Sequence, residues 1–378
     1  MMLTLWLLLQ GLSVIGVANY LRHLPRNAQI EAPEGVVMLL SVRDDWDGGP
    51  ALIARLKAQS APFRLCIATS GCCPAADALA ARESDWVEVI HAGIATDEGQ
   101  KVHKLRAALR ALRPEDRYIL FIDADIAPPT RLVGRLLFPL VRDKADIVTG
   151  YRLLMPRAAP VHTLIGAVEM QLATLPRFPS ATMPWGGAMA LTRHTADRLN
   201  LEEAMAGRLS DDMAIGLAGW RAKLRLRPVR DLLVASPLEG DGRAAWGFGV
   251  RQYRHIWSNS PAMWSLATLV VVVQAAAWGW AIGWGGWMAV AIGYAAAWGR
   301  ALLRLRIIAG VVDPDQARIV RRSLWWDIAA PFAVTWSHLA LQVAAITSSR
   351  IRWGEWDYWV RRGRVVRMAP VDQKPAGN

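Results

Sequence analysis

Two long stretches without charge constrain this 378-residue chain more than any other feature. Residues 1–21 carry no charged side chain, and residues 258–299 contain no ionisable side chain except Tyr294. A helix needs roughly 20 apolar residues to cross the hydrocarbon core of a bilayer. The first stretch therefore predicts one N-terminal transmembrane helix, and the second predicts a hairpin of two helices at about 262–281 and 286–300.

A third apolar stretch, residues 328–349, is interrupted by Pro331 and His338. If it crosses the membrane, the basic tail at 350–378 lies outside, against the tendency of Lys and Arg to stay in the cytoplasm. If it is re-entrant or interfacial, the tail stays cytoplasmic. Because proline interrupts a helix, we favour a broken or interfacial helix at this point of the C-terminal membrane region, which covers 261–349.

The charge distribution predicts the orientation of the chain. Arg22 and Arg26 follow the first apolar run, which is typical of an anchor and not of a cleavable signal peptide. The net charge of +12 is concentrated beside apolar runs, as at residues 300–322, and cytoplasmic loops of membrane proteins have this composition. We expect an integral protein of the bacterial inner (cytoplasmic) membrane with a cytosolic domain, the lipid bilayer as partner and no nucleic acid. The oligomeric state stays open.

Residues 34–240 alternate short apolar runs with longer amphipathic ones. This pattern is typical of βαβ units, in which buried parallel strands are continuous and rich in β-branched residues. The expected strands are 36–42, 64–68, 86–91, 118–122 and 147–150, with a helix at 101–112. We therefore predict an α/β domain with a mostly parallel sheet, and we expect its ligands beyond the carboxyl ends of the strands.

The fourth expected strand ends in Asp123-Ala124-Asp125. Residues two apart in an extended chain project to the same side, so Asp123 and Asp125 can present two carboxylates together. Such oxygens suit Mg²⁺ or Mn²⁺ and leave coordination positions open for the phosphate oxygens of a nucleotide sugar. The alternative is a turn in which an aspartate caps the next helix.

A second acidic motif, Asp211-Asp212, follows Ser210 and opens a helical run. Acidic residues in the first turn of a helix are ordinary capping chemistry, so a purely structural role is open. A carboxylate held at a helix start beside a pocket can also accept the proton of an attacking hydroxyl group. Asp212 is the candidate general base.

The third motif is Arg251-Gln252-Tyr253-Arg254-His255-Ile256-Trp257, within a segment at 241–260 that precedes the apolar hairpin. It is typical of an amphipathic interfacial helix with arginines among lipid headgroups. The alternative is a diphosphate site, since arginine offers two parallel donors to phosphate.

These three motifs, in this order on an α/β domain between membrane segments, resemble the membrane-bound inverting glycosyltransferases of families 2 and 21, and the ceramide glucosyltransferases most. The resemblance implies a GT-A type nucleotide-sugar-binding domain at 34–240. It also implies roles for individual residues: metal and donor binding by Asp123 and Asp125, general base for Asp212 beside Asp211, and a (Q/R)xxRW motif at Arg251, Arg254 and His255. The motif's usual Trp is His255 here, and Trp257 lies two residues further on.

Two further segments extend the resemblance. The segment from Gly99 to Leu105 looks like the family's Asn-Pro-Lys-Val-Asn-Asn-Leu segment, with Lys101 as its lysine, which implies donor binding. Gly186 and Gly187 match a glycine-rich strand on the acceptor side of the family's site. The family's aspartate after the second strand is missing here, and Asp44 after the first strand is expected to help hold the nucleotide instead.

The expected function is inverting transfer of a sugar from a UDP-sugar, with Mg²⁺ or Mn²⁺, to the hydroxyl group of a membrane lipid. Ceramide is the first acceptor, with diacylglycerol or a hopanoid as alternatives. A processive polysaccharide synthase and a non-catalytic membrane protein on a degenerate transferase fold are the other classes left open.

Overall fold

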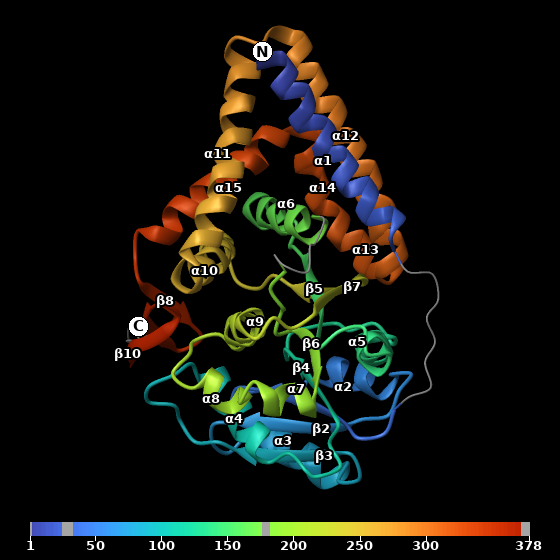
Figure 1. Ribbon diagram of the computed structural model, residues 1–378, viewed down its shortest axis with the longest axis vertical. Coiled ribbons are helices and arrows are strands. Elements are labelled where there is room, and N and C mark those ends of the chain that lie inside the picture. The colour runs from blue at the N-terminus through green and yellow to red at the C-terminus, as the bar shows by residue number, and fades with distance from the viewer. Residues whose placement is uncertain (1, 25–32, 176–181, 372–378) are drawn as a thin grey trace, which may run out of the picture.

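The computed structural model describes residues 2–24, 33–175 and 182–371. It has two parts, which Figure 1 shows with the longest axis vertical: a sheet flanked by helices in the lower half, and long helices that converge toward the N-terminus in the upper half. A small second sheet lies beside the lower half, near the C-terminus.

The main sheet has seven strands in the order β3-β2-β1-β4-β6-β5-β7. The strands are β1 (Val36–Ser41), β2 (Arg64–Thr69), β3 (Val87–His91), β4 (Tyr118–Ile122), β5 (Ile147–Met155), β6 (Ala188–Thr192) and β7 (Leu226–Pro237). Neighbouring strands pair in parallel except where β6 pairs antiparallel with β4 and β5. The prediction of a mostly parallel α/β sheet is confirmed, with β6 and β7 added to the five strands expected from periodicity.

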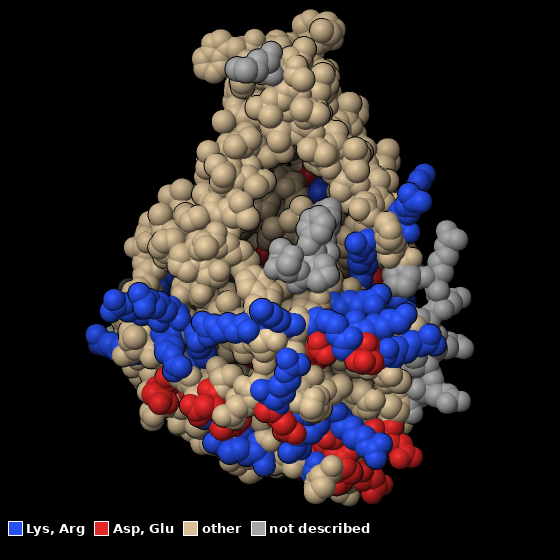
Figure 2. Space-filling view, in the orientation of Figure 1, with Lys and Arg blue, Asp and Glu red and all other residues tan. Residues whose placement is uncertain are grey.

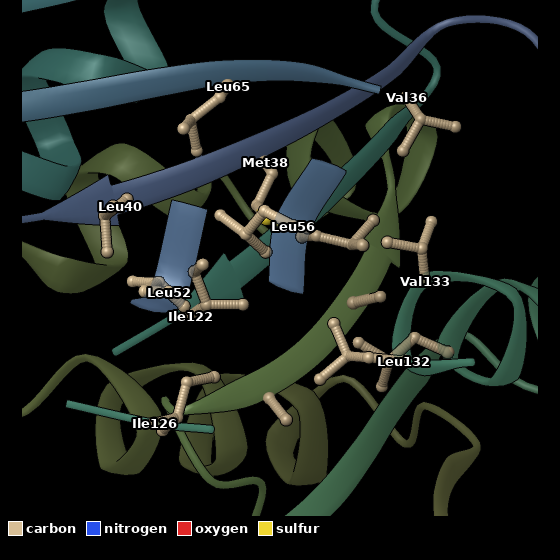
Figure 3. Close-up of a cluster of buried hydrophobic side chains, with 14 of the residues drawn as sticks. Val36, Met38, Leu40, Leu52, Leu56, Leu65, Ile122, Ile126, Leu132 and Val133 are labelled. Carbon is tan, nitrogen blue, oxygen red and sulfur yellow. The ribbon is translucent and has the colours of Figure 1, made fainter. Parts of the chain in front are cut away.

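The strands form because their side chains are apolar on both faces. Met38 of β1 lies in a cluster on one face of the sheet that also contains Leu56 and Leu132, and Figure 3 shows this cluster. Leu39 of the same strand packs on the opposite face with Phe121. The flanking helices are α2 (Pro50–Lys57), α3 (Pro74–Arg82), α4 (Gln100–Arg110), α5 (Leu132–Val141), α7 (Arg193–Arg198), α8 (Leu201–Met205) and α9 (Asp211–Arg221). A strand buried on both faces needs this continuous apolar sequence.

The upper helices begin and end as follows: α1 (Met2–Arg22), α6 (Pro160–Ala173), α10 (Gly242–Asn259), α11 (Pro261–Gly283), α12 (Gly286–Val311), α13 (Pro314–Val320), the short 3₁₀ turn η2 (Arg321–Ser323), α14 (Leu324–Ala329) and α15 (Pro331–Ile346). In the described part of the chain, α1 and α11 are long and apolar enough to cross a membrane. Helix α12 is the second arm of the predicted hairpin, but it extends beyond residue 300 and carries the buried Arg300 and Arg304.

Charge separates the two parts of the molecule. In Figure 2 the upper part is almost free of charged side chains on the face shown and is hollowed between the helices, and a band of Lys and Arg lies below it. An uncharged zone bordered by basic residues is the distribution expected at a membrane surface.

The third apolar stretch is bent by 103° between the helices that flank Ala330. The break predicted at Pro331 is therefore present. The bent pair of helices, Pro314–Ala329 and Pro331–Ile346, follows Asp313, which forms an ion pair with Arg55 of α2 at 3.0 Å. It is followed by β8 (Arg350–Trp353), whose small sheet contacts the main domain. Both ends of the bent pair thus lie beside the same domain.

The basic tail predicted at 350–378 is corrected by the structure. Strands β8, β9 (Trp356–Arg361) and β10 (Arg364–Pro370) form an antiparallel sheet. The turn between β9 and β10 is Arg362-Gly363, and both residues have positive φ, as a tight hairpin requires. Ile351, Tyr358 and Val360 pack on Leu209 of the main domain, so apolar contact holds this basic segment in place.

A buried ion pair joins α12 to α14. Arg304 donates to Asp327, and its Nε also donates to Thr174 Oγ1 at 3.1 Å. Gln171 donates to the other carboxylate oxygen of Asp327 at 3.2 Å. Removing one partner of a buried pair leaves the other charge without compensation.

We expect Arg304→Met to lower the stability of the protein by about 3–5 kcal/mol, because Asp327 is left buried and charged. The measurement is the unfolding transition of the full chain in detergent. Arg306→Met, on the exposed side of the same helix, is the matched control and should change stability by less than about 0.5 kcal/mol. The double variant Arg304→Met with Asp327→Leu should recover most of the lost stability, because no buried charge is left unpaired. If Arg304→Met unfolds at the same point as the wild type, the ion pair is not needed for stability.

Candidate active site

The carboxyl edge of the main sheet collects residues from distant parts of the chain. Asp123 and Asp125 follow β4 at this edge. Because β6 runs antiparallel to β4 and Ala188 pairs with Ile122, the residues that precede β6, Gly186 and Gly187, lie at the same edge. The topology therefore brings the first acidic motif and the glycine pair together. Ligands of open α/β sheets bind at this edge, beyond the carboxyl ends of the parallel strands.

The starts of α4 and α9 meet because Gly99 has no side chain. The Gly99 N–H donates to the Arg208 carbonyl at 2.9 Å, and a Cβ on Gly99 would lie 2.5 Å from the Leu209 carbonyl oxygen. This close approach places Lys101, in the first turn of α4, beside Asp211, in the first turn of α9.

Lys101 joins the two acidic motifs. Its Nζ lies 2.6 Å from Asp123 Oδ1 and 3.1 Å from Asp211 Oδ2. Burial disfavours the ammonium charge, but the neighbouring carboxylates, Asp123 above all, outweigh burial and raise the pKa of Lys101. The lysine is therefore a fixed positive charge that holds β4 and α9 in register.

The carboxylates around Lys101 carry more negative charge than this one lysine neutralises. Burial, with Asp123 beside it, raises the pKa of Asp125 to about 6. Burial and the neighbouring Asp212 and Asp123 likewise raise the pKa of Asp211 to about 6, against the attraction of Lys101. Crowded carboxylates of this kind are relieved by a bound cation.

The donor set at this edge fits a divalent cation that is shared with a ligand. In the described ranges no group of three or more His, Cys, Asp or Glu side chains could hold a metal ion. Asp123 and Asp125 supply two carboxylates, and Mg²⁺ is commonly held by one or two carboxylates plus substrate phosphates and water. The pair suits a cation that arrives with a diphosphate.

Asp212 is the acidic residue on the open side of the cluster. It is half-buried, whereas Asp211 is buried. Its Oδ1 accepts hydrogen bonds from the Ser210 hydroxyl and from the Met213 N–H at 2.7 Å, and its Oδ2 accepts one from the Gly186 N–H at 3.4 Å. These hydrogen bonds fix the position of the Asp212 carboxylate at the start of α9.

Gly186 occupies the space next to the Lys101–Asp211 pair. A Cβ at this position would lie 2.6 Å from Asp211 Oδ2 and 2.9 Å from Lys101 Nζ. A Cβ on Gly187 would lie 2.2 Å from the ring of Trp185. The glycine pair thus leaves room for the ion pair and for a buried aromatic side chain.

Arg152 is a site residue that sequence reasoning missed. It lies in the second half of β5, where its Nε donates to Glu169 Oε2 at 2.8 Å and its Nη2 donates to Gln252 Oε1 at 2.8 Å. Glu169 is buried in α6, and its charge raises the pKa of Arg152 despite burial. The sequence feature that could have identified Arg152 is a charged residue within an apolar strand. A buried arginine is rare unless an acidic group or a ligand pairs with it.

Arg251 lies close to Arg152 on the same side of the cluster. Burial and the positive charge of Arg152 lower the pKa of Arg251 to about 10, although Asp125 and Asp123 oppose this shift. Both guanidinium groups lie over the ring of Phe248, at 5.0 Å for Arg152 and 5.4 Å for Arg251. Two guanidinium groups side by side form an anion site.

Arg254, predicted to bind the diphosphate, is placed elsewhere by the structure. Its Nη2, Nε and Nη1 donate to the carbonyls of Ala344, Ala345 and Arg350, at 2.8, 3.1 and 2.7 Å. The guanidinium group therefore satisfies the carbonyls at the end of α15, which a helix C-terminus leaves without partners. We correct its role to holding α15 and β8 against α10.

His255 and Trp257 point to different neighbours. The His255 ring packs edge-on against Trp353 with centroids 5.5 Å apart, and burial lowers the pKa of His255 to about 4, against the attraction of Asp212. Trp257 packs against Trp264 of α11 at 4.9 Å. His255 is thus a neutral residue near Asp212, and Trp257 does not take the place of the missing tryptophan beside it.

Asp44 lies at the same edge, after β1. Its Oδ1 accepts hydrogen bonds from the N–H groups of Ser70 and Gly71, at 2.9 and 3.0 Å. It therefore fixes the loop after β2.

Comparisons with known proteins give structural neighbours without sequence relatives. No family model matches the chain, and no curated protein sequence matches it. Mannosyltransferase PcManGT from Pyrobaculum calidifontis, in complex with GDP-Man and Mn²⁺, is similar at a TM-score of 0.48 and 14% identity, covering 91% of this chain and 97% of that chain. S. aureus TarS in complex with UDP-GlcNAc has a TM-score of 0.40 and 10% identity, covering 82% and 90%. Glucosyl-3-phosphoglycerate synthase from Mycobacterium tuberculosis, in complex with phosphoglyceric acid, has a TM-score of 0.35 and 14% identity, covering 54% and 70%.

We expect Gly186→Ala to separate Lys101 from Asp211 and to destabilise the protein by about 1–3 kcal/mol, because the methyl group has no space. Thermal unfolding of the full chain measures the effect. Gly247→Ala is the matched control, since nothing lies within 4 Å of a Cβ there and the position is in helix α10. That control should be neutral or slightly stabilising, because alanine favours a helix over glycine. Equal stability of the two variants would contradict the packing described for Gly186.

Proposed function

We propose that this protein is an inverting glycosyltransferase of the GT-A type that moves a sugar from a nucleotide-diphosphate donor to the hydroxyl group of a membrane lipid. One observation carries the proposal: a lysine, four carboxylates and two guanidinium groups converge at one sheet edge. They are Lys101; Asp123, Asp125, Asp211 and Asp212; and Arg152 and Arg251.

The charge pattern supports a sugar donor that carries a diphosphate. Two carboxylates, Asp123 and Asp125, lie near two guanidinium groups, Arg152 and Arg251, close enough for their charges to interact. A divalent cation, Mg²⁺ or Mn²⁺, would be held by Asp123 and Asp125 and would neutralise phosphate charge. The guanidinium groups bind the remaining phosphate oxygens. Asp44 would contact the nucleoside in this proposal, and UDP is the first nucleotide proposed.

Asp212 starts the reaction by taking the proton of the acceptor hydroxyl group. The acceptor oxygen attacks the anomeric carbon on the face opposite the diphosphate. The bond from that carbon to the diphosphate oxygen breaks, and this oxygen leaves with the bonding electrons. Arg251 and Arg152 stabilise the charge that develops there. Because attack and departure use opposite faces, the configuration inverts.

The position of the site supports a lipid acceptor. Arg251 lies on α10, which ends at Asn259, and the apolar helix α11 begins at Pro261. A hydroxyl group at the head of a membrane lipid can therefore reach Asp212 while its chains stay in the bilayer, and such positioning lowers the barrier. Ceramide is the first acceptor proposed, then diacylglycerol or a hopanoid. The site faces the cytosol at the inner membrane in this proposal.

We expect Asp212→Asn to lower the turnover of sugar transfer by about 10²–10⁴, because the amide cannot accept the proton. The assay supplies UDP-sugars and GDP-Man to extracted lipids and follows glycolipid products by mass spectrometry. Asp315→Asn, at an exposed carboxylate whose side chain is 90% accessible, is the matched control and should keep wild-type turnover. Near wild-type turnover of Asp212→Asn would remove this residue as the base, and a long polymer product would favour a polysaccharide synthase.

We expect EDTA to abolish transfer and excess Mn²⁺ or Mg²⁺ to restore it, because the carboxylates of Asp123 and Asp125 repel the donor's diphosphate unless a cation neutralises them. The measurement is the initial rate at a fixed donor concentration. Asp125→Asn should raise the Mn²⁺ concentration needed for half-maximal rate. Full activity in chelator would show that the carboxylate pair has another role.

A further inference from the structure

The C-terminal sheet contacts the proposed donor site at several distant points. The Gln100 N–H, next to Lys101, donates to the Tyr358 hydroxyl at 3.3 Å. The Glu355 carboxylate forms an ion pair with Arg43, after β1, at 2.8 Å. Strands β8–β10 therefore border the site between the loop after β1 and the start of α4.

Trp353, the last residue of β8, is the side chain of this sheet that contacts the site's arginine. The Cζ atom of Arg251 lies 5.6 Å from the centroid of the Trp353 ring. The ring of Phe248 lies at 5.4 Å from the same atom, and the Trp353 ring also packs on His255. Two aromatic rings thus contact one guanidinium group.

In the described part of the chain, the rings of Phe248 and Trp353 contact the Arg251 guanidinium group. Among the residues that the structure describes, no carboxylate or carbonyl accepts a hydrogen bond from its side chain, in contrast to Arg152, which donates to Glu169 and Gln252. A ring below a guanidinium group attracts it through the π face. The N–H donors point outward in the guanidinium plane and stay available for an anion.

We propose that Trp353 is a positioning residue: its ring holds the guanidinium group of Arg251 where it binds the diphosphate of the donor. This role rests on the proposed function. It makes the segment after the last membrane helix a part of the donor site, although that segment supplies no group to the reaction.

Trp359 provides a matched control in the same sheet. It lies in β9, and its ring contacts Arg350 at 5.7 Å and Arg367 at 4.6 Å. Trp353 and Trp359 are both half-buried. The two tryptophans thus share the sheet and the type of contact, and they differ in whether the arginine belongs to the site.

The test measures binding of UDP and of GDP, each with Mn²⁺, to the full chain in detergent by calorimetry. We expect Trp353→Ala to weaken binding by about 5- to 30-fold, the range of cation–π contacts between exposed and desolvated sites. Trp353→Phe should stay within about threefold of the wild type, and Trp359→Ala within about twofold. Trp353→Leu keeps apolar volume without a π face, so it should bind as weakly as Trp353→Ala with an unchanged unfolding temperature.

A double substitution separates positioning from direct contact. If Trp353 acts through Arg251, Trp353→Ala combined with Arg251→Ala should bind no more weakly than Arg251→Ala alone. A further equal loss in the double variant would overturn the proposal, because Trp353 would then contact the nucleotide itself. Wild-type affinity in Trp353→Leu would also overturn it. If the wild type binds neither nucleotide, the proposed function fails first, and the role of Trp353 fails with it.

Discussion

The ion pairs of Lys101 with Asp123 and Asp211 are the interaction on which the rest of the site depends. They connect the end of a central strand to the starts of two helices that lie about a hundred residues apart in the chain. Gly99 and Gly186 leave the space in which these groups meet. A buried lysine between carboxylates keeps its charge, so the three elements stay joined across the ordinary pH range.

The site separates charge in space. Carboxylates gather at the ends of β4 and α9, and guanidinium groups gather on β5 and α10. Within each group like charges repel where water is scarce, and the ion pairs of Lys101 and of Glu169 offset part of this repulsion. A ligand that carries both a cation and an anionic diphosphate relieves both sides at once. This complementarity is a reason to look for a metal–nucleotide complex and not for a neutral sugar alone.

Much of the fold could be predicted because its signals are local. The strands β1 and β4 are continuous apolar runs, and Pro331 identifies the position at which the third apolar stretch bends. The role of Arg254 could not be predicted, because an arginine that binds phosphate and one that binds carbonyls at the end of α15 look alike in sequence. Arg152 was missed since the expected strand ended at residue 150. The C-terminal sheet was missed because its strands are rich in arginine, and the apolar surface that holds it comes from Leu209.

The small C-terminal sheet has a consequence for biosynthesis. Its strands are synthesised after every helix of the upper part. The contacts of Tyr358 with Gln100 and of Trp353 with Arg251 form only at that moment. A chain that stops before Arg350 therefore carries the carboxylates and arginines without the segment that borders them.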